Sequence, residues 1–295
     1  MEIAFIVVAH DRPNHLARLL ESLSTLPART FLHIDKKSRI EDFDLSSATN
    51  LELAKDRVSV HWGEWSQVEA EVELLRQALL SGDVDFDYFI LLSGSDYPIS
   101  SKETILKTLS DPDRPLFIEC EEVPSAAAPR KLVARYHIKT HDSSLIRYAA
   151  KVWRRFGETR PGYSAMFRKW PFFKGSAWWA LPRDAAEYLV EQYDCQTSLT
   201  KFCRNVLIPD EVFPHTVLMN SQFGDRIRSY SLTYADWRIE GPHPATITDA
   251  HLDFLLPGGE QPQTKSRHQE PRSLFARKFP DDSAALVKRI KSKFL

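Results

Sequence analysis

The sequence predicts an α/β fold with a mostly parallel central sheet. The first observation is a set of continuous β-branched and apolar runs that end in polar residues, a pattern typical of strands buried on both faces. The second is that these runs alternate with stretches whose apolar residues recur at helical spacing. Strand, helix, strand, strand, helix and strand follow one another within the first hundred residues, and this order favours a Rossmann-like sheet.

The first strand is expected over 3–10 (IAFIVVAH), and the next helix begins near Pro13, because proline suits the first position of a helix. An amphipathic helix is expected over 65–80 (WSQVEAEVELLRQALL). The other predicted strands lie at 29–34, 57–63, 87–93 and 177–182, and the other predicted helices at 183–193, 210–221 and 282–295.

Composition limits the possible classes of protein. With 295 residues, 43% of them hydrophobic, the chain can bury a large core as one domain over 1–295. Its 39 Lys and Arg against 40 Asp and Glu give a net charge of -1, so no overall field attracts nucleic acid. The N-terminus lacks a signal-peptide pattern and no apolar run approaches about 20 residues, which predicts a cytoplasmic protein.

The cysteines do not suggest a structural or metal-binding role. There are three, which is an odd number, and their spacing matches neither a disulfide framework nor a zinc site. Cys120, Cys195 and Cys203 are therefore expected to be reduced and buried.

Three of the predicted strands end in groups that contain charged residues. These groups are His10-Asp11, Asp35-Lys36-Lys37 and Ser93-Gly94-Ser95-Asp96. The carboxyl ends of parallel strands meet at one edge of a sheet, where ligands bind. Asp35 is suited to accept hydrogen bonds from a sugar hydroxyl or a base N–H, and Asp96 lies where a nucleotide-sugar enzyme holds its donor or a metal. The simpler alternative for each residue is a solvated charge at a strand end.

The sequence argues against a metal at Asp96, because residue 94 is Gly and no Asp-x-Asp motif is present. A single carboxylate is too few ligands for Mg²⁺ or Mn²⁺. The charge of a departing diphosphate would then have to be neutralised by cationic side chains. Arg277 and Lys278 in SLFARKFP are the candidates, with a solvated basic face as the alternative.

Adjacent tryptophans in a strand point to opposite faces, so one of Trp178 and Trp179 is expected in the core. The other one, together with Trp237 in YADWR, has the flat ring that stacks on sugars and bases. Core packing is an equally good explanation for each of them.

The motif IPDEVFPH places two acids at the expected start of a helix. Pro209 fixes the entry to the helix, and capping explains Asp210. Glu211 is the acid that capping does not explain. A carboxylate that takes a proton from an attacking hydroxyl is what an inverting sugar transfer requires.

Eight motifs occur in the order VVAHDRP, FLHIDKKS, HWGEWSQVEAEVELL, YFILLSGSDYPI, FKGSAWWALPRDAAEYL, IPDEVFPHTVLMNS, YADW and LFARKF. Together they resemble the core-2/I-branching β-1,6-N-acetylglucosaminyltransferase and peptide O-xylosyltransferase family over residues 3–280. The resemblance implies a GT-A type fold, a UDP-sugar donor, inversion at the anomeric carbon, and no metal or other cofactor. It also implies a nucleotide-binding half (1–110), an acceptor and catalytic half (111–280) and a C-terminal basic helix (281–295).

The resemblance also assigns roles to particular residues. It implies that Glu211 is the catalytic base, that Lys278 meets the UDP diphosphate, and that His10 and Asp35 belong to the donor pocket. The implied acceptor residues and the candidates for a second diphosphate-binding arginine are less well defined. The expected donor side adds Asp96, Trp237 and Arg277; the acceptor side has Glu119, Lys131, Trp178 and Asp210; the candidate arginines are Arg238, Arg267 and Arg272.

These residues predict a metal-independent glycosyltransferase that moves N-acetylglucosamine or xylose onto a glycan or lipid-linked glycan during assembly of a bacterial surface polysaccharide. Basic segments at 147–157 and 286–295 suggest contact with an anionic membrane, or ordinary amphipathic helices. Two other hypotheses remain open. One is a non-catalytic glycan-binding module, and the other is a metal-dependent phosphoester hydrolase with the ligands His10, Asp11, Asp35, Asp96 and His215.

Overall fold

A central sheet, seven-stranded among the residues described, runs through the protein in its computed structural model, which describes residues 1–123, 133–135, 137, 160, 162–238, 243–257, 259 and 273–294. The strand order is β10-β6-β9-β4-β1-β2-β3, and in this sheet only β9 runs against the others. The predicted α/β class with a mostly parallel sheet is therefore confirmed. The strands are β1 (Ile3–Ala9), β2 (Ala28–Ile34), β3 (Leu51–Leu53), β4 (Tyr88–Ser93), β6 (Leu116–Phe117), β9 (Ala180–Pro182) and β10 (Ile227–Arg228).

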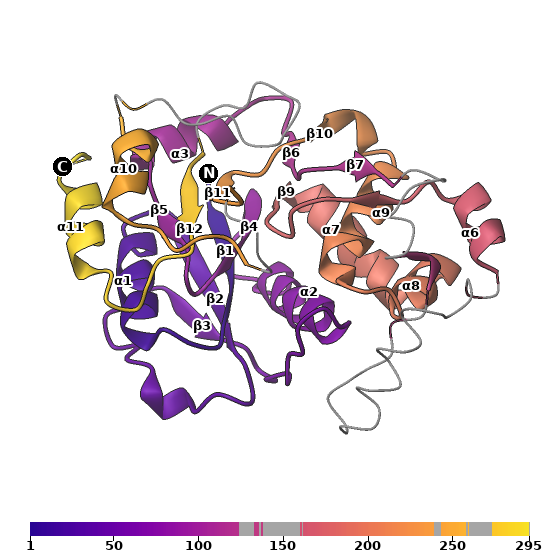
Figure 1. The fold of residues 1–295 in the computed structure, drawn as a ribbon, viewed down its shortest axis with the longest axis horizontal. Coiled ribbons are helices and arrows are strands. Elements are labelled where there is room, and N and C mark those ends of the chain that lie inside the picture. Colours follow the sequence, from indigo (N-terminus) through magenta and orange to yellow (C-terminus); the bar gives the residue numbers. More distant parts are fainter. Residues whose placement is uncertain are drawn as a thin grey trace.

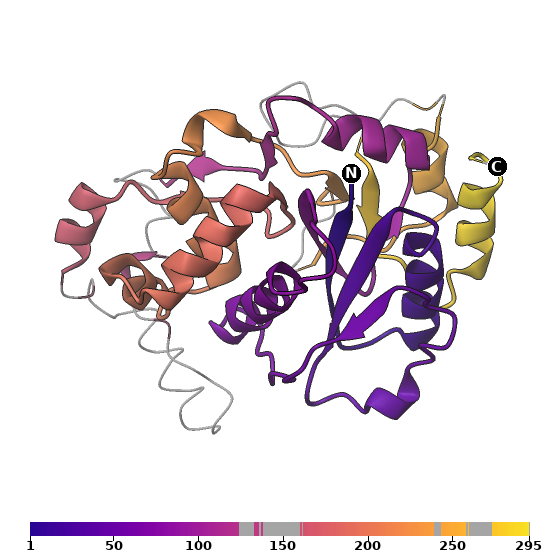
Figure 2. The same cartoon turned by 180° about the vertical axis from the view of Figure 1, so that it is seen from behind.

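Helices cover both faces of this sheet, as Figures 1 and 2 show from opposite sides. One hydrophobic cluster packs the first helix group against the sheet, and a second cluster packs the other group against the opposite face. The first group is α1 (Pro13–Leu23), α3 (Lys102–Leu109), α10 (Asp249–Leu255) and α11 (Ala284–Lys291). The second is α2 (Ser66–Leu79), α6 (Tyr163–Lys169), α7 (Arg183–Asp194), α8 (Ser198–Cys203) and α9 (Phe213–Met219).

A small second sheet brings the C-terminal part of the chain to the carboxyl edge of the large sheet. It has the order β11-β12-β5, formed by Thr233–Ala235, Phe275–Arg277 and Tyr97–Pro98. Because β5 directly follows Asp96, its antiparallel pairing with β12 places Arg277 beside that residue. A separate two-stranded antiparallel sheet joins β7 (Glu121–Glu122) to β8 (Phe173–Lys174), which is distant in sequence.

Two predicted elements are wrong. Residues 57–63 are not a strand, and the third parallel strand is β3. The backbone N–H of Val58 donates to Nε2 of His33 (2.8 Å), and Arg57 donates to the carbonyl of Ile34 (2.8 Å). Side chains therefore satisfy polar groups that a strand ladder would otherwise pair.

The helix predicted over 210–221 is split into a 3₁₀ turn, η2 (Pro209–Glu211), and α9. Val212 separates the two with φ -127°, and Pro214 lies in the first turn of α9. Proline has no N–H to donate to the preceding turn, so it begins a new helix rather than continuing the old one. Two further 3₁₀ turns are η1 (Ile40–Asp42) and η3 (Gly224–Arg226).

All three cysteines are free, and Cys203 is buried as predicted. The prediction of burial is wrong for Cys195, which is exposed because it caps the end of α7 beyond its packed face. No helix in the described part of the chain is both long enough and apolar enough to span a membrane.

Candidate active site

The loops after β1, β2 and β4 lie side by side at the carboxyl edge of the sheet. The N–H of Asp35 donates to the carbonyl of Ala9 (2.8 Å), and the N–H of Gly94 donates to the carbonyl of Val8 (2.9 Å). The hydroxyl of Ser38 donates to the carbonyl of His10 (2.7 Å). The three strand ends that the sequence singled out are therefore neighbours in space.

Asp96 is a fully buried carboxylate at the centre of this edge. It accepts hydrogen bonds from the backbone N–H of Ser93 (2.9 Å) and from the Ser93 hydroxyl, and its Oδ1 lies 3.2 Å from Nε of Arg277. Burial raises the pKa of Asp96, while the charge of Arg277 and the hydrogen bonds from Ser93 oppose the rise. These contacts compensate for the cost of removing the carboxylate from water.

The cations beside Asp96 are crowded. The Arg277 guanidinium lies 3.9 Å from the centre of the Trp178 ring, so Trp178 faces the site, while Trp179 is buried in the core. Burial and the charge of Arg277 lower the pKa of Lys278, and a third cation, Arg12, lowers it further. One tryptophan is thus in the core and the other faces the site, as expected. Neither lies in a strand, however, because β9 begins only at Ala180 and is shorter than the strand predicted over 177–182.

The Asp96 loop cannot carry an Asp-x-Asp motif. A Cβ at position 94 would lie 2.7 Å from the Cβ of Ala9, closer than real Cβ contacts, because this loop packs directly on β1. Within the described residues, no three His, Cys, Asp or Glu residues gather in a way that could hold a metal ion. The proposed ligands of a phosphoester hydrolase, including His10, Asp11 and Asp35, are not assembled for that purpose.

The loop that carries Glu211 approaches the site from the second half of the chain. Ile208 has left-handed backbone dihedrals (φ 54°), which are rare for a β-branched residue. The proline that follows restricts the backbone of Ile208 further, because such a residue favours extended conformations. Its N–H donates to the carbonyl of Gly63 (3.0 Å), and the Gln67 amide donates to Oδ2 of Asp210 (3.2 Å). The N-terminal part of α2 and the turn before it therefore hold the acidic turn in place.

Three acids of this region lie close together, two of them buried and Glu211 partly buried. Asp210 and Glu71, which points inward from α2, are both buried, and burial raises both pKa values, that of Asp210 to about 6. Burial also raises the pKa of Glu211 to about 7, and Asp210 contributes, while Lys174 and Arg277 act in the opposite direction. Glu211 is therefore a carboxyl group that exchanges its proton near neutral pH.

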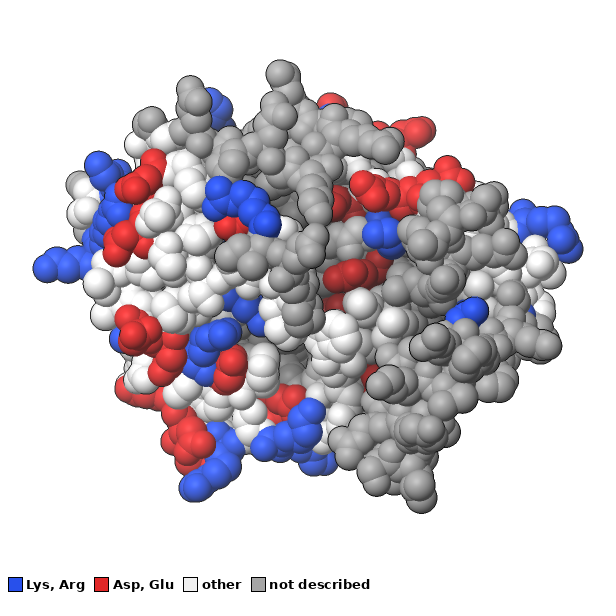
Figure 3. Space-filling view, viewed as in Figure 1, with Lys and Arg blue, Asp and Glu red and all other residues white. Residues whose placement is uncertain are grey.

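Gly175 brings Glu211 and Glu119 together. Its N–H donates to the carbonyl of Glu211 (3.1 Å), and a Cβ at this position would lie 1.7 Å from the carbonyl oxygen of Glu119, so no other residue fits. Lys174, one residue earlier, supplies a positive charge that acts on Glu211. Figure 3 shows acidic side chains in a hollow near the middle of one face, with a basic side chain beside them.

Other predicted residues differ in their surroundings. Asp35 is buried and accepts a hydrogen bond from the N–H of Lys37 (2.8 Å), while His10 is exposed and 3.7 Å from Asp11. Trp237 is 48% exposed, as a stacking platform would need. Lys131, Arg267 and Arg272 lie outside the described residues.

The guanidinium of Arg238 donates to both oxygens of the buried Asp236 (2.9 and 2.7 Å), whose pKa is lowered as a result. A diphosphate-binding role for Arg238 stays a prediction. His215 was a candidate metal ligand in the hydrolase hypothesis, but it is fully buried. Its Nε2–H donates to the carbonyl of Ser176 (2.9 Å), and burial lowers its pKa to about 4, so it is neutral.

The sequence reasoning missed three residues of the site: Arg12, Glu71 and Lys174. A usable signal existed for two of them. Arg12 directly follows a strand-end acid and precedes the proline that begins α1. Glu71 occupies the same helical face as Val68 and Val72, where an acid is unusual. Lys174 gave no local signal, because its place depends on the pairing of β8 with β7.

Cations beside a carboxylate of raised pKa, at the carboxyl edge of a mostly parallel sheet, are features of an enzyme that acts on an anionic substrate. The model of the Core-2/I-Branching enzyme family matches residues 3–254. The chain therefore belongs to the Core-2/I-Branching enzyme family.

The chain is also similar in sequence to individual xylosyltransferases. Xylosyltransferase 1 of Homo sapiens is 26% identical over 289 residues, which cover 95% of this chain and 29% of that protein. Xylosyltransferase 2 of Rattus norvegicus is 26% identical over 243 residues, covering 80% and 27%. The chain thus spans less than a third of the length of these relatives. Among solved structures, 4-diphosphocytidyl-2C-methyl-D-erythritolsynthase from Anaerococcus prevotii DSM 20548 has a TM-score of only 0.34, at 14% identity over 65% of this chain and 76% of that one.

Replacing Asp96 by alanine should destabilise the fold strongly. The substitution leaves the Arg277 charge buried without its partner, which costs about 3–5 kcal/mol of unfolding free energy. Urea denaturation at pH 7 measures this loss. Asp83→Ala is the matched control, because its ion pair with Arg29 (2.6 Å) is exposed and its loss should have a small effect. Equal losses in the two variants would contradict the importance given to Asp96.

The raised pKa of Glu211 should make its contribution to stability depend on pH. Below its usual value of 4.5 the carboxyl is protonated in both the folded and the unfolded chain. Between pH 4.5 and about 7 the unfolded chain releases the proton and the folded chain keeps it, so the wild type loses stability as pH rises. The unfolding free energy of Glu211→Gln should therefore exceed that of the wild type increasingly up to pH 7, and then by a constant amount. A difference that does not vary with pH would refute the raised pKa.

Proposed function

We propose that the protein is an inverting glycosyltransferase that moves N-acetylglucosamine or xylose from a UDP-sugar to a hydroxyl of a glycan acceptor. Membership of the Core-2/I-Branching enzyme family and the names of the xylosyltransferase relatives support the class of reaction. The mostly parallel sheet, with its candidate site beyond the strand ends, supports the GT-A type of fold.

The observation that carries this proposal is the place of Arg277. Its guanidinium lies 3.2 Å from the Asp96 carboxylate, and its charge also lowers the pKa of Glu211. A cationic pocket suited to a diphosphate therefore adjoins a carboxylate suited to accept a proton. A transferase that uses a nucleotide diphosphate as leaving group needs these two features next to each other.

In the proposed reaction, Glu211 accepts the proton of the acceptor hydroxyl while the hydroxyl oxygen attacks the anomeric carbon. The bond from that carbon to the diphosphate oxygen breaks, and its electron pair leaves with UDP. Arg277 and Lys278 meet the negative charge that grows on the leaving diphosphate. A pKa of about 7 keeps Glu211 basic enough to take the proton and partly ionised at neutral pH.

The remaining residues of the site divide between the two substrates. Asp35 and His10, after β2 and β1, are the proposed contacts to the nucleoside, and Trp237 walls the sugar. Glu119 is held against Glu211 by Gly175 and is the proposed acceptor contact. Attack by the hydroxyl on the face of the sugar opposite the leaving diphosphate inverts the configuration of the anomeric carbon.

The proposal extends to metal independence, because Arg277 and Lys278 supply positive charge where a divalent ion would otherwise act. It also places the transfer in the cytoplasm, in the assembly of a bacterial surface polysaccharide on a lipid-linked or free glycan. Contact with anionic lipid would involve α11, on which Lys288 is exposed, and Lys293, which is exposed just beyond its end. Arg289 and Lys291 form ion pairs with acidic neighbours.

UDP should raise the melting temperature of the purified protein, because a ligand that binds only the folded state stabilises it. The rise should be the same in EDTA as in Mn²⁺, and CDP and GDP should have smaller effects. Differential scanning fluorimetry measures the shift and then ranks the UDP-sugars. If no uridine nucleotide shifts the melting temperature, the proposed donor is wrong.

Glu211→Gln should lower turnover by about 10²–10⁴-fold, the usual contribution of a general base. The assay is release of UDP from the best UDP-sugar in the presence of a panel of glycoside acceptors. The shift in melting temperature caused by UDP should remain, because the variant keeps the cations. Glu191→Gln, at an exposed position on α7, is the control and should keep full turnover. Near-normal turnover of Glu211→Gln would remove it as the base.

A further inference from the structure

Arg12 has a side chain that its structural role does not explain. It precedes α1, and its carbonyl accepts the N–H of Leu16 (2.9 Å), which any residue could provide. Its side chain makes no capping hydrogen bond. Asp281 instead accepts from the N–H groups of Asn14 (2.8 Å) and His15 (3.1 Å), so the first turn of α1 is already capped.

The backbone of Arg12 is also disfavoured. Its φ of 57° is in the left-handed region, which glycine and asparagine adopt far more readily than arginine. Strained backbone of this kind is concentrated at functional sites. The presence of an arginine at such a position therefore indicates that its guanidinium has a function.

The guanidinium itself lacks a full set of partners. Nη1 of Arg12 is buried and has no hydrogen-bond partner among the described residues, and the nearest carboxylate oxygen, of Asp11, is 3.7 Å away. Only 23% of the side chain is exposed. A buried donor on a charged group that is left unpaired costs free energy, so a missing acceptor is expected at this point.

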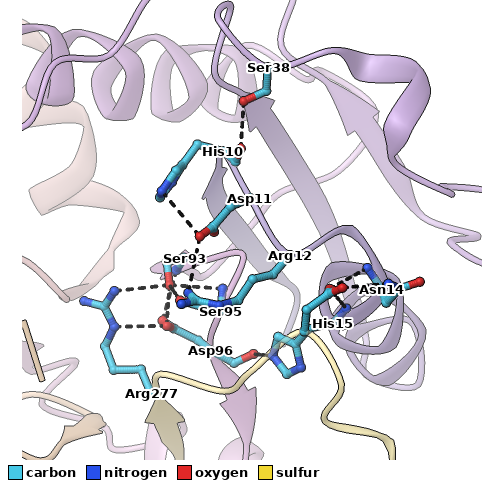
Figure 4. Close-up of polar contacts among 11 residues, drawn as sticks. His10, Asp11, Arg12, Asn14, His15, Ser38, Ser93, Ser95, Asp96 and Arg277 are labelled. Atoms are coloured by element: carbon cyan, nitrogen blue, oxygen red, sulfur yellow. Dashed lines mark hydrogen bonds and ion pairs between the residues drawn. The ribbon is translucent and has the colours of Figure 1, made fainter. Parts of the chain in front are cut away.

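The surroundings of Arg12 indicate the charge of that acceptor. Figure 4 shows Arg12 and Arg277 reaching toward the Ser93–Asp96 turn from opposite sides. The charge of Arg12 is close enough to act on both Arg277 and Lys278. Three cations thus lie near the buried Asp96, which already has its hydrogen bonds, and near the half-exposed Asp11. Glu211 also acts on Arg277, but its raised pKa of about 7 leaves it only partly ionised at neutral pH. The surplus is positive, and an anion with more than one charge would balance it.

We infer that Arg12 is a third diphosphate-binding residue, which holds the phosphate oxygens of the nucleotide donor together with Arg277 and Lys278. This inference rests on the proposed function, because that function supplies the nucleoside diphosphate. Arg12 comes from the loop after β1, whereas Arg277 ends β12 and Lys278 directly follows that strand. The diphosphate is then held between the first strand of the fold and the last one.

Binding of UDP and of uridine to the intact protein tests this role. Arg12→Asn suits the left-handed backbone and removes the cation, so its melting temperature should not fall. Its affinity for UDP, measured by isothermal titration calorimetry, should fall about 10–100-fold, the worth of one or two charged hydrogen bonds. Its affinity for uridine should be unchanged, and Arg12→Lys should recover part of the affinity for UDP.

Arg114→Asn is the matched control. Arg114 also has a left-handed backbone (φ 46°), but its side chain donates to the carbonyl of Asp87 (3.2 Å), which directly precedes β4, at the opposite end of the strands. The affinity of the Arg114→Asn variant for UDP should equal that of the wild type. If Arg12→Asn binds UDP as well as Arg114→Asn does, the role of Arg12 is wrong and the proposed function stands. If the wild type does not bind UDP, both are wrong.

Discussion

The buried charge of Asp96 is the constraint on which the site depends. A carboxylate without exposure to water is tolerated only where its hydrogen bonds and its counter-charge are fixed in place. The turn from Ser93 supplies the hydrogen bonds, and β12 supplies Arg277. His15 adds a third tie: its Nε2–H donates to the Asp96 carbonyl (2.9 Å), so its Nδ1 accepts from the hydroxyl of Ser283 (2.6 Å). Asp96 thus joins the fourth strand and β12 through its carboxylate, and the first helix and the C-terminal segment through its backbone carbonyl and His15.

A second electrostatic balance controls the acidic side of the site. Glu71 and Asp210 are buried next to each other, and both are driven toward the protonated state. The pKa of Glu211 is also raised, to about 7, and Lys174 and Arg277 limit this rise because their charges act against its burial. Arg277 therefore takes part in both balances. An anion bound at Arg277 would screen its charge and raise the pKa of Glu211, so occupancy of the cationic pocket and the basicity of this carboxyl are coupled.

The sequence predicts the buried strands well because burial on both faces leaves a clear pattern of continuous apolar residues. It predicts the strand-end residues Asp35 and Asp96 for the same reason, since topology alone brings parallel strand ends together. It fails at 57–63, where an apolar alternation resembles a strand but side chains from β2 and Arg57 take the hydrogen bonds. It also misses Lys174, because short strands pair through contacts that are distant in sequence.

Two loops bring charged groups into the site, and their backbone conformations are the features that the sequence predicts least well. Arg12 and Ile208 both have left-handed backbones, which local preference opposes for an arginine and strongly opposes for a β-branched residue before proline. Each is held by distant contacts, Ile208 through the carbonyl of Gly63 and Arg12 through the capped start of α1. Both distortions direct a charged group, Arg12 itself and Glu211 three residues after Ile208, toward the same region. The rest of the fold offsets the local cost, and the strain is where the charges of the site require it.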